Sequence, residues 1–273
     1  MNTKPRNKAY LWEFMTVKEM RVALKKTKTV ILPIGVIEQH GYHLPLNTDV
    51  YNAYELARLA SEKTGCLVAP PFTYTFSGGT LPGTININPQ VVSLLIIEAC
   101  RSFVMQGLKN IVVLLGHGGS ENQKATEEAV DMFLRQNPDL KVNVALLPFT
   151  ELSSTVKKAF KDKDYHAGYM ETSLMLYWHP ELVRQDEVTT DKRPILNMLR
   201  QDPDNYQVRR KAISNKYVYP AITQHPGIKV GVMGDPYKAS ARFGEKVVKE
   251  CLKNIIKLIK DMERKLGKVS RHY

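Results

Sequence analysis

The amino-acid sequence predicts an α/β fold in which helices cover both faces of a mostly parallel sheet. Predicted strands alternate along the chain with predicted helices, the order that is typical of βαβ units. Two of the strand segments, residues 29–37 and 110–115, are apolar without alternation, as expected for strands that are buried on both faces. With 273 residues, 43% of them hydrophobic, the chain is expected to form one large domain over residues 1–273.

The first half of the chain carries the most clearly marked elements. The predicted strand at 29–37 runs directly into Glu38, and we expect a helix over about 50–63 and a short strand at 66–69. A loop rich in Pro, Ser, Gly and Thr spans residues 70–88. The helix after it has Asn88 as the N-cap, Pro89 in the first position and Gly107 just past its end, which together fix its limits.

The second half is less regular. The strand at 110–115 is followed by a helix that starts near Glu121, and a further strand is predicted at 142–147. Residues from about 180 to 230 are polar and interrupted by prolines, so we predict a loop-rich insertion there, and the sequence does not decide between a lid and an oligomer contact. The chain ends in a helix with one apolar stripe at alternating four- and three-residue steps, formed by Val248, Leu252, Ile255, Ile259, Met262 and Leu266.

The charge of the chain is strongly positive, with a formal net value of +12. Between residues 243 and 273, nine Lys or Arg stand against four Asp or Glu, so much of the surplus lies on the terminal helix. Lysines opposite an apolar stripe favour a solvated helix that docks on the sheet. A basic nucleic-acid-binding module remains an alternative, although no recognition motif accompanies the charge.

The targeting and cysteine signals are weak. No apolar run has the length needed to cross a membrane and the first residues lead into no signal-type stretch, so we expect a cytoplasmic protein without membrane contacts. Cys66, Cys100 and Cys251 are isolated from one another in the sequence, which predicts buried, reduced thiols and no thiolate metal site.

Side chains that can bind metal follow the predicted strands. In an open α/β sheet the functional groups gather at the carboxyl ends of the strands. Two clusters fit this rule, with Glu38, His40, His43 and Asp49 in the first and His117 among glycines in the second. A third cluster, His166 and Glu171, lies near the start of a predicted helix. Imidazole and carboxylate without thiolate are ligands that suit Zn²⁺ or Mn²⁺.

Each cluster has a simpler explanation when it is taken alone. Glu38 and His40 could be a surface pair, and His117 could cap a helix or bind an anion there. His166 and Glu171 could be a buried, hydrogen-bonded pair. Seven metal-compatible side chains at three strand ends or helix starts are nevertheless difficult to explain as packing, so a hydrolytic metal centre is the favoured hypothesis.

Four sequence blocks closely resemble the creatininase, or creatinine amidohydrolase, family. They are residues 32–49 (LPIGVIEQHGYHLPLNTD), residues 77–84 (SGGTLPGT), residues 116–119 together with 166–173, and residues 231–236 (GVMGDP). The blocks span almost the whole chain, and the first is highly specific because of its length and order. The resemblance implies a three-layer α/β/α sandwich with a mostly parallel sheet, and a homo-oligomer, commonly a hexamer.

The resemblance also implies roles for individual residues. Two divalent ions, Zn or Mn, would be held by Glu38, Asp49 and His117 on one side and by His40, Asp49 and Glu171 on the other, with Asp49 as the bridge. His166 and Glu171 would be the catalytic residues, and His166 would pass a proton to the leaving nitrogen. Substrate contacts would come from Ser77, Gly78, His166 and Tyr169.

The chain departs from the family pattern near these positions. Leu115 and Ser120 replace the two asparagines that usually flank the Gly-His-Gly-Gly run, Gly119 stands where true creatininases have a ligand glutamate, and Tyr169 stands where a glutamate is common. We therefore predict a relative that is not a true creatininase.

The predicted activity is hydrolysis of a small molecule, either a cyclic amide that is opened or a related non-peptide C–N bond, by a hydroxide that bridges two metal ions. A hydrolase that opens a cyclic ketone, such as an inositol-derived diketone, by C–C cleavage is the second possibility. A family member that binds metal but has lost turnover is a third.

Overall fold

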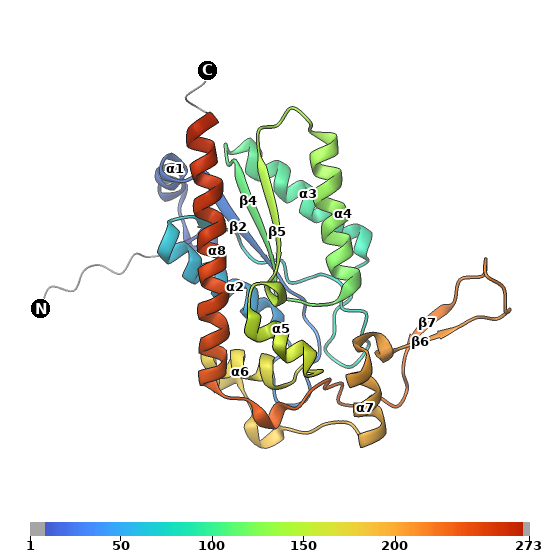
Figure 1. Cartoon of the computed structure of the whole chain (residues 1–273). Coiled ribbons are helices and arrows are strands. Elements are labelled where there is room, and N and C mark those ends of the chain that lie inside the picture. Colours follow the sequence, from blue (N-terminus) through green and yellow to red (C-terminus); the bar gives the residue numbers. More distant parts are fainter. Residues whose placement is uncertain (1–8, 270–273) are drawn as a thin grey trace, which may run out of the picture.

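The computed structural model describes residues 9–269, and the side chains of residues 9–265. The expectations for the N-terminal segment 1–8 and for the side chain of Leu266 lie outside this part. Five parallel strands form the central sheet in the order β1-β3-β2-β4-β5, which confirms the predicted parallel arrangement (Figure 1). The strands are β1 Tyr10–Leu11, β2 Thr29–Ile34, β3 Leu67–Val68, β4 Asn110–Leu115 and β5 Asn143–Pro148.

Helices cover both faces of this sheet and complete three layers. One face packs against α1 Val17–Lys26, α3 Pro89–Met105 and α4 Ser120–Gln136. The other face packs against α2 Thr48–Thr64, α5 Ser154–Lys161, α6 Tyr169–Trp178 and α8 Ala241–Val269. Successive strand residues point to opposite faces, so Val30 and Leu32 join the first core while Ile31 joins the second. The central strands are buried on both sides, which is why their sequences lack alternation.

The boundary between β2 and the polar segment after it differs from the prediction. The strand ends at Ile34, three residues earlier than expected. A Cβ on Gly35 would lie 2.5 Å from the backbone nitrogen of Val50, so the start of α2 packs directly against the chain at this point. This close approach brings the first turn of α2, with Asp49 in it, to the carboxyl end of β2.

The start and end signals of α3 are confirmed. The Asn88 side chain accepts a hydrogen bond from the backbone N–H of Gln90 at 2.9 Å, and Pro89 is the first helical residue. Gly107 follows the end of the helix with a φ of +83°, a conformation that favours glycine.

The loop-rich insertion at residues 180–230 contains more regular structure than its sequence pattern indicates. This insertion contains α7 Arg193–Gln201, the 3-10 turn η5 Pro203–Tyr206, and an antiparallel ribbon of β6 Gln207–Arg210 with β7 Ala221–Gln224. Figure 1 shows the ribbon extending away from the layered body. Neither strand contains a fully buried residue, so the sequence has no apolar alternation from which the hairpin could be recognised.

The C-terminal helix docks on the sheet as its stripe predicts. Val248, Ile255, Ile259 and Met262 are buried in the core on the α2 side, and Leu252 packs against that core. The three cysteines are free and buried. Among the described residues, no helix combines the length and the apolar character needed to cross a membrane.

Candidate metal centre

Glu38, Asp49 and His117 converge at the carboxyl ends of β2 and β4. Nδ1 of His117 lies 2.9 Å from Oδ2 of Asp49 and 3.2 Å from Oε1 of Glu38. All three side chains are buried. Parallel neighbouring strands end at the same edge of a sheet, so residues that follow β2 and β4 meet although 68 residues separate Asp49 from His117.

A second group forms around His40 on the other side of Asp49. Nε2 of His40 lies 3.3 Å from Oδ1 of Asp49 and 3.6 Å from Oε2 of Glu171. Nδ1 of His40 donates to the backbone carbonyl of Glu38 at 3.2 Å, and Nε2 faces the carboxylates. Asp49 therefore offers one oxygen to each group, which is the arrangement of a bridging ligand.

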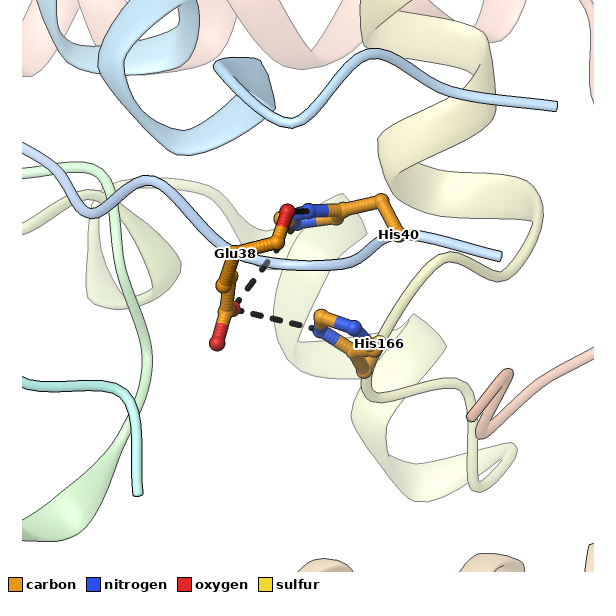
Figure 2. Close-up of side chains that lie close together, drawn as sticks. All are labelled: Glu38, His40 and His166. Carbon is orange, nitrogen blue, oxygen red and sulfur yellow. Dashed lines mark hydrogen bonds and ion pairs between the residues drawn. The ribbon is translucent and has the colours of Figure 1, made fainter. Parts of the chain in front are cut away.

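His166 lies beside both groups. Its Nδ1 is 3.6 Å from Oε1 of Glu38, and its ring centroid is 4.4 Å from that of His40. Figure 2 shows both imidazoles pointing toward the Glu38 carboxylate. The far nitrogen of His166, Nε2, is in contact with Gln39, at 2.8 Å from its backbone carbonyl oxygen and 3.0 Å from its side-chain nitrogen. This contact fixes the orientation of the ring.

Two glycines let the His117 loop approach α2. A Cβ on Gly116 would lie 2.0 Å from the backbone oxygen of Asp49, and a Cβ on Gly119 would lie 2.2 Å from Nε2 of His117. The position at which true creatininases are expected to carry a glutamate is thus filled by the His117 ring. Any side chain at residue 119 would have to displace this imidazole.

The start of α6 is held by a buried carboxylate. Asp164 accepts hydrogen bonds from the backbone N–H groups of Tyr169, Met170 and Asp235 at 2.9–3.0 Å. A carboxylate that satisfies the first N–H groups of a helix acts as its cap. Because α6 carries Glu171, Asp164 fixes the position of that side chain.

We expect Asp164→Ala to lower the free energy of unfolding by about 3 kcal/mol, since three buried N–H groups lose their charged acceptor. Urea denaturation followed by circular dichroism measures this change. Replacing the exposed Asp261, which pairs with Arg264 on α8, is the matched control and should change stability by less than about 0.5 kcal/mol. Equal stability of Asp164→Ala and the parent chain would contradict the capping role.

The histidines and carboxylates of the cluster shift one another's pKa values. Burial opposes a charge on His40, but Asp49, Glu171 and Glu38 outweigh it and raise the pKa of His40 to about 10. Burial also opposes a charge on His117, whose pKa is nevertheless raised well above its usual value by Glu38 and Asp49.

The pKa values of Glu38, Glu171 and His166 are shifted by burial and by neighbouring charges. Burial would raise the pKa of Glu38, but His117 and His166 hold it well below its usual value. Burial raises the pKa of Glu171 to about 7, although His40 opposes the shift. Burial and the neighbouring His40 lower the pKa of His166 to about 4, so this imidazole is neutral at pH 7.

Within the described part of the chain, several buried polar atoms of the cluster have no hydrogen-bond partner. They include Oε1 of Glu38, Nε2 of His40 and Nε2 of His117. Leaving such atoms unsatisfied in the interior is costly. Three sets of ligand atoms lie close enough together, within 4.8 Å in each set, to hold a cation, and they are Glu38 with Asp49 and His117, His40 with Asp49 and Glu171, and Glu38 with His40 and His166. The donor set fits Zn²⁺ or Mn²⁺.

A cavity of about 330 Å³ opens onto this cluster. One wall carries the aromatic side chains of Phe149, Phe160 and Tyr165. The insertion contributes Pro203, Asp204, Tyr206, Gln224 and Ile228 to the lining. Residues of the insertion therefore form part of the cavity lining.

Of the residues predicted to contact the substrate, Ser77 lines the cavity, whereas Gly78 and Tyr169 do not. Ser77 lines the cavity, and its hydroxyl donates a hydrogen bond to Oε2 of Glu38. Gly78 is absent from the lining but lies against the hydroxyl of Tyr206. The Tyr169 ring packs edge-on against Phe243, on the far side of α6 from the cavity.

His43 lies behind the ligand groups and contributes no atom to them. Its Nε2 is 2.9 Å from the hydroxyl of Thr172, with which it forms a hydrogen bond. Burial, together with His40 and His166, lowers the pKa of His43 to about 4, so it remains neutral at pH 7.

The comparisons with known proteins point to one family. Residues 13–259 match the family model "Creatininase: Creatinine amidohydrolase". The chain is 30% identical over 240 residues to the mycofactocin precursor peptide peptidase of Mycolicibacterium smegmatis, covering 85% of this chain and 84% of that protein. It is 26% identical over 269 residues to the 3-dehydro-scyllo-inosose hydrolase of Thermotoga maritima, covering 93% and 84%. A solved structure named "Creatininase Mn" aligns with a TM-score of 0.75 at 23% identity, covering 93% of this chain and 98% of that one.

Proposed function

The chain belongs to the creatininase family, and from this premise we propose that it is a dinuclear metal-dependent hydrolase of a small molecule that contains a C–N bond. The observation that carries the proposal is the position of Asp49, which offers one oxygen to the group of Glu38 and His117 and the other to the group of His40 and Glu171. Two divalent ions, Zn or Mn, are the proposed cofactors, and the similarity to creatininase structures named for Mn and for Zn-Zn supports either metal.

The proposed roles follow from the geometry. A metal pair held by Glu38, His40, Asp49, His117 and Glu171 would lower the pKa of a bound water and so would supply the nucleophile. Glu38 and Ser77 are joined by a hydrogen bond, so the loop at 77–79 holds that carboxylate in place. His166 is neutral and lies 3.6 Å from Glu38, where it can accept a proton and pass it to a leaving nitrogen.

The cavity supports a small substrate. Its volume of about 330 Å³ is at the lower end of ligand pockets in general. None of its described lining residues is Lys or Arg, in a chain that has 39 of them, so an anionic group on the substrate has no partner there apart from the metal centre. We therefore propose a neutral or cationic substrate, with an apolar part against Phe149 and Phe160.

C–C cleavage of a cyclic ketone is the second candidate. It is favoured by the similarity to the 3-dehydro-scyllo-inosose hydrolase. The same activated water could attack a ring ketone, and the reaction would then release a carboxylic acid with no amine. The named activity of the 30% identical relative adds short modified peptides to the substrates that need testing.

Purified protein loaded with Mn²⁺ or Zn²⁺ should be screened against lactams, hydantoins, formamides, blocked dipeptides and cyclic ketones. Release of an amine supports the amidohydrolase, whereas acid without amine supports the C–C hydrolase. A chelator should abolish turnover and added metal should restore it. Protein that binds less than one equivalent of metal under these conditions would contradict both candidates.

His166→Gln should reduce kcat by about 100-fold while the metal content stays unchanged, because glutamine cannot carry a proton to the leaving group. Steady-state kinetics with a substrate from the screen and elemental analysis of the same samples measure the two effects. His225→Gln, on the loop after β7, is the control. Loss of metal in His166→Gln would instead make His166 a ligand, as its place in the third set of ligand atoms allows.

We also propose that the protein forms a homo-oligomer and is cytoplasmic. A homo-oligomer is supported by apolar side chains exposed along α3, among them Val91, Leu94 and Leu95. We propose a cytoplasmic enzyme because the isolated cysteines are all free thiols.

A further inference from the structure

Tyr206 lies where the insertion meets the loop at 77–80. A Cβ on Gly78 would be only 2.2 Å from the Tyr206 hydroxyl, and Gly78 has a φ of +90°. The hydroxyl of Thr80 donates to Oε1 of Gln224 at 3.1 Å, which joins the same loop to β7. The tyrosine hydroxyl is therefore held next to the loop whose Ser77 bonds to the Glu38 carboxylate.

The hydrogen bonds of Gln207 determine what the Tyr206 hydroxyl can do. Nε2 of Gln207 donates to Oε1 of Glu121 at 2.8 Å, and Oε1 of Gln207 accepts from Arg209 at 3.1 Å. A carboxylate can only accept and a guanidinium can only donate, so the orientation of this amide is fixed. The same Nε2 lies 2.6 Å from the hydroxyl of Tyr206 and donates to it.

The hydroxyl proton of Tyr206 is consequently free. Its oxygen already accepts from Gln207, and no described residue accepts a hydrogen bond from it. Tyr206 lines the cavity together with Glu38, Ser77 and His166. Burial, with Glu121 and Asp204 nearby, raises the pKa of Tyr206 to about 12, so the group is a protonated donor at neutral pH.

We propose that the Tyr206 hydroxyl donates a hydrogen bond to the oxygen of the substrate carbonyl that is attacked, and so stabilises the negative charge that develops there. Preorganised donors aimed at a developing oxyanion are among the largest contributions to catalysis. This inference rests on the proposed hydrolase function, because only a substrate that is hydrolysed at the metal centre would place its carbonyl oxygen there. The proposal also explains why residue 78 is a glycine, since a side chain there would displace the Tyr206 hydroxyl.

The test uses acetohydroxamate, whose oxygens bind divalent metal and mimic the oxygens of an attacked amide. Calorimetric titration into Mn²⁺-loaded protein should give an affinity for Tyr206→Phe that is about 10- to 100-fold weaker than for the parent chain, since a hydrogen bond to a charged oxygen is lost. Metal content and thermal stability should stay unchanged. Tyr219→Phe, on the exposed ribbon, is the matched control.

Gly78→Ala provides a second, independent variant. It should weaken acetohydroxamate in the parent background by displacing the hydroxyl, and should have a smaller effect when Tyr206→Phe has already removed the clashing oxygen. This comparison also separates contact with Tyr206 from strain at the positive φ, which is present in both backgrounds. Should Tyr206→Phe fail to fold, Gly78→Ala still tests the position of the hydroxyl.

The outcomes separate the two levels of the proposal. Unchanged affinity in Tyr206→Phe would overturn the role of the hydroxyl and leave the metal centre intact. Absence of acetohydroxamate binding to the metal-loaded parent chain would contradict the metal centre and this inference together. Equal effects of Gly78→Ala in both backgrounds would show that Gly78 does not position Tyr206.

Discussion

Asp49→Asn is expected to lose at least one equivalent of metal and to reduce turnover on the order of 10⁴-fold, because loss of an activated water removes several kcal/mol of stabilisation. Among the described residues, Asp49 is the one that approaches both His40 and His117 with separate oxygens, at 3.3 and 2.9 Å. An amide has one oxygen and can serve only one of the two groups. The effect should therefore exceed that of removing a residue from a single group.

Elemental analysis after gel filtration and kinetics on the same samples measure both effects. Asp131→Asn is the matched control because Asp131 is exposed on α4 and pairs only with Arg135. Asp49→Glu keeps the charge but moves it by one methylene, and should retain metal with reduced turnover. Two metal equivalents and parental turnover in Asp49→Asn would rule out a bridging role.

The convergence of the site could be predicted because it follows from the topology. Glu38 and His117 each come after a strand that is apolar on both faces, and such strands lie side by side in the centre of a parallel sheet. The helical limits of α3 were equally accessible, since Asn88, Pro89 and Gly107 act locally. Parallel topology thus accounts for the predicted convergence of Glu38 and His117, and local capping residues account for the predicted limits of α3.

Tyr169 was predicted to contact the substrate, but its ring packs against Phe243 outside the cavity lining. The helical pattern of the sequence accounts for this placement. Residues 169 and 171 lie in one helix, and two successive steps of about 100° place their side chains on nearly opposite sides. Because Glu171 points to the cluster, Tyr169 has to point away, toward Phe243. Helical periodicity outweighs motif position here.

The contribution of the insertion to the cavity lining could not be predicted from sequence patterns. Tyr206 and Asp204 come from a short 3-10 turn before a ribbon with no buried face, and neither element leaves a periodic signal. Asp164 was missed for a different reason. Its role consists of accepting backbone N–H groups as far away as Asp235, and a sequence does not reveal such partners.

The affinity for metal should rise steeply with pH. Asp49, Glu171 and Glu38 raise the pKa of His40 to about 10 against the effect of burial, and the pKa of His117 is also raised well above its usual value. Both imidazoles are therefore protonated in the metal-free protein at pH 7, and both protons must leave when the ring nitrogens bind metal. We expect the apparent affinity for Mn²⁺ to increase at least about tenfold per pH unit between pH 7 and 8.5, since each proton released contributes about tenfold.

Stability should change in the opposite direction in the two forms. A raised pKa in the folded state stabilises the metal-free protein below the unfolded pKa of about 6.5, and this contribution is lost as pH rises toward 10. The metal-bound protein has already lost those protons and gains affinity over the same range. The increase in Tm caused by Mn²⁺ should therefore grow from pH 6.5 to pH 8.5.

Calorimetry in two buffers of different ionisation enthalpy counts the protons released, and differential scanning fluorimetry follows Tm in the same samples. His179→Gln is a suitable control because this histidine pairs with Glu181 outside the cluster and should leave the proton count unchanged. A pH-independent affinity with no proton release would mean that His40 and His117 do not lose protons when the metal binds. The carboxylates alone would then have to hold the ions, and a shared centre at Asp49 would no longer explain why two imidazoles are buried against it.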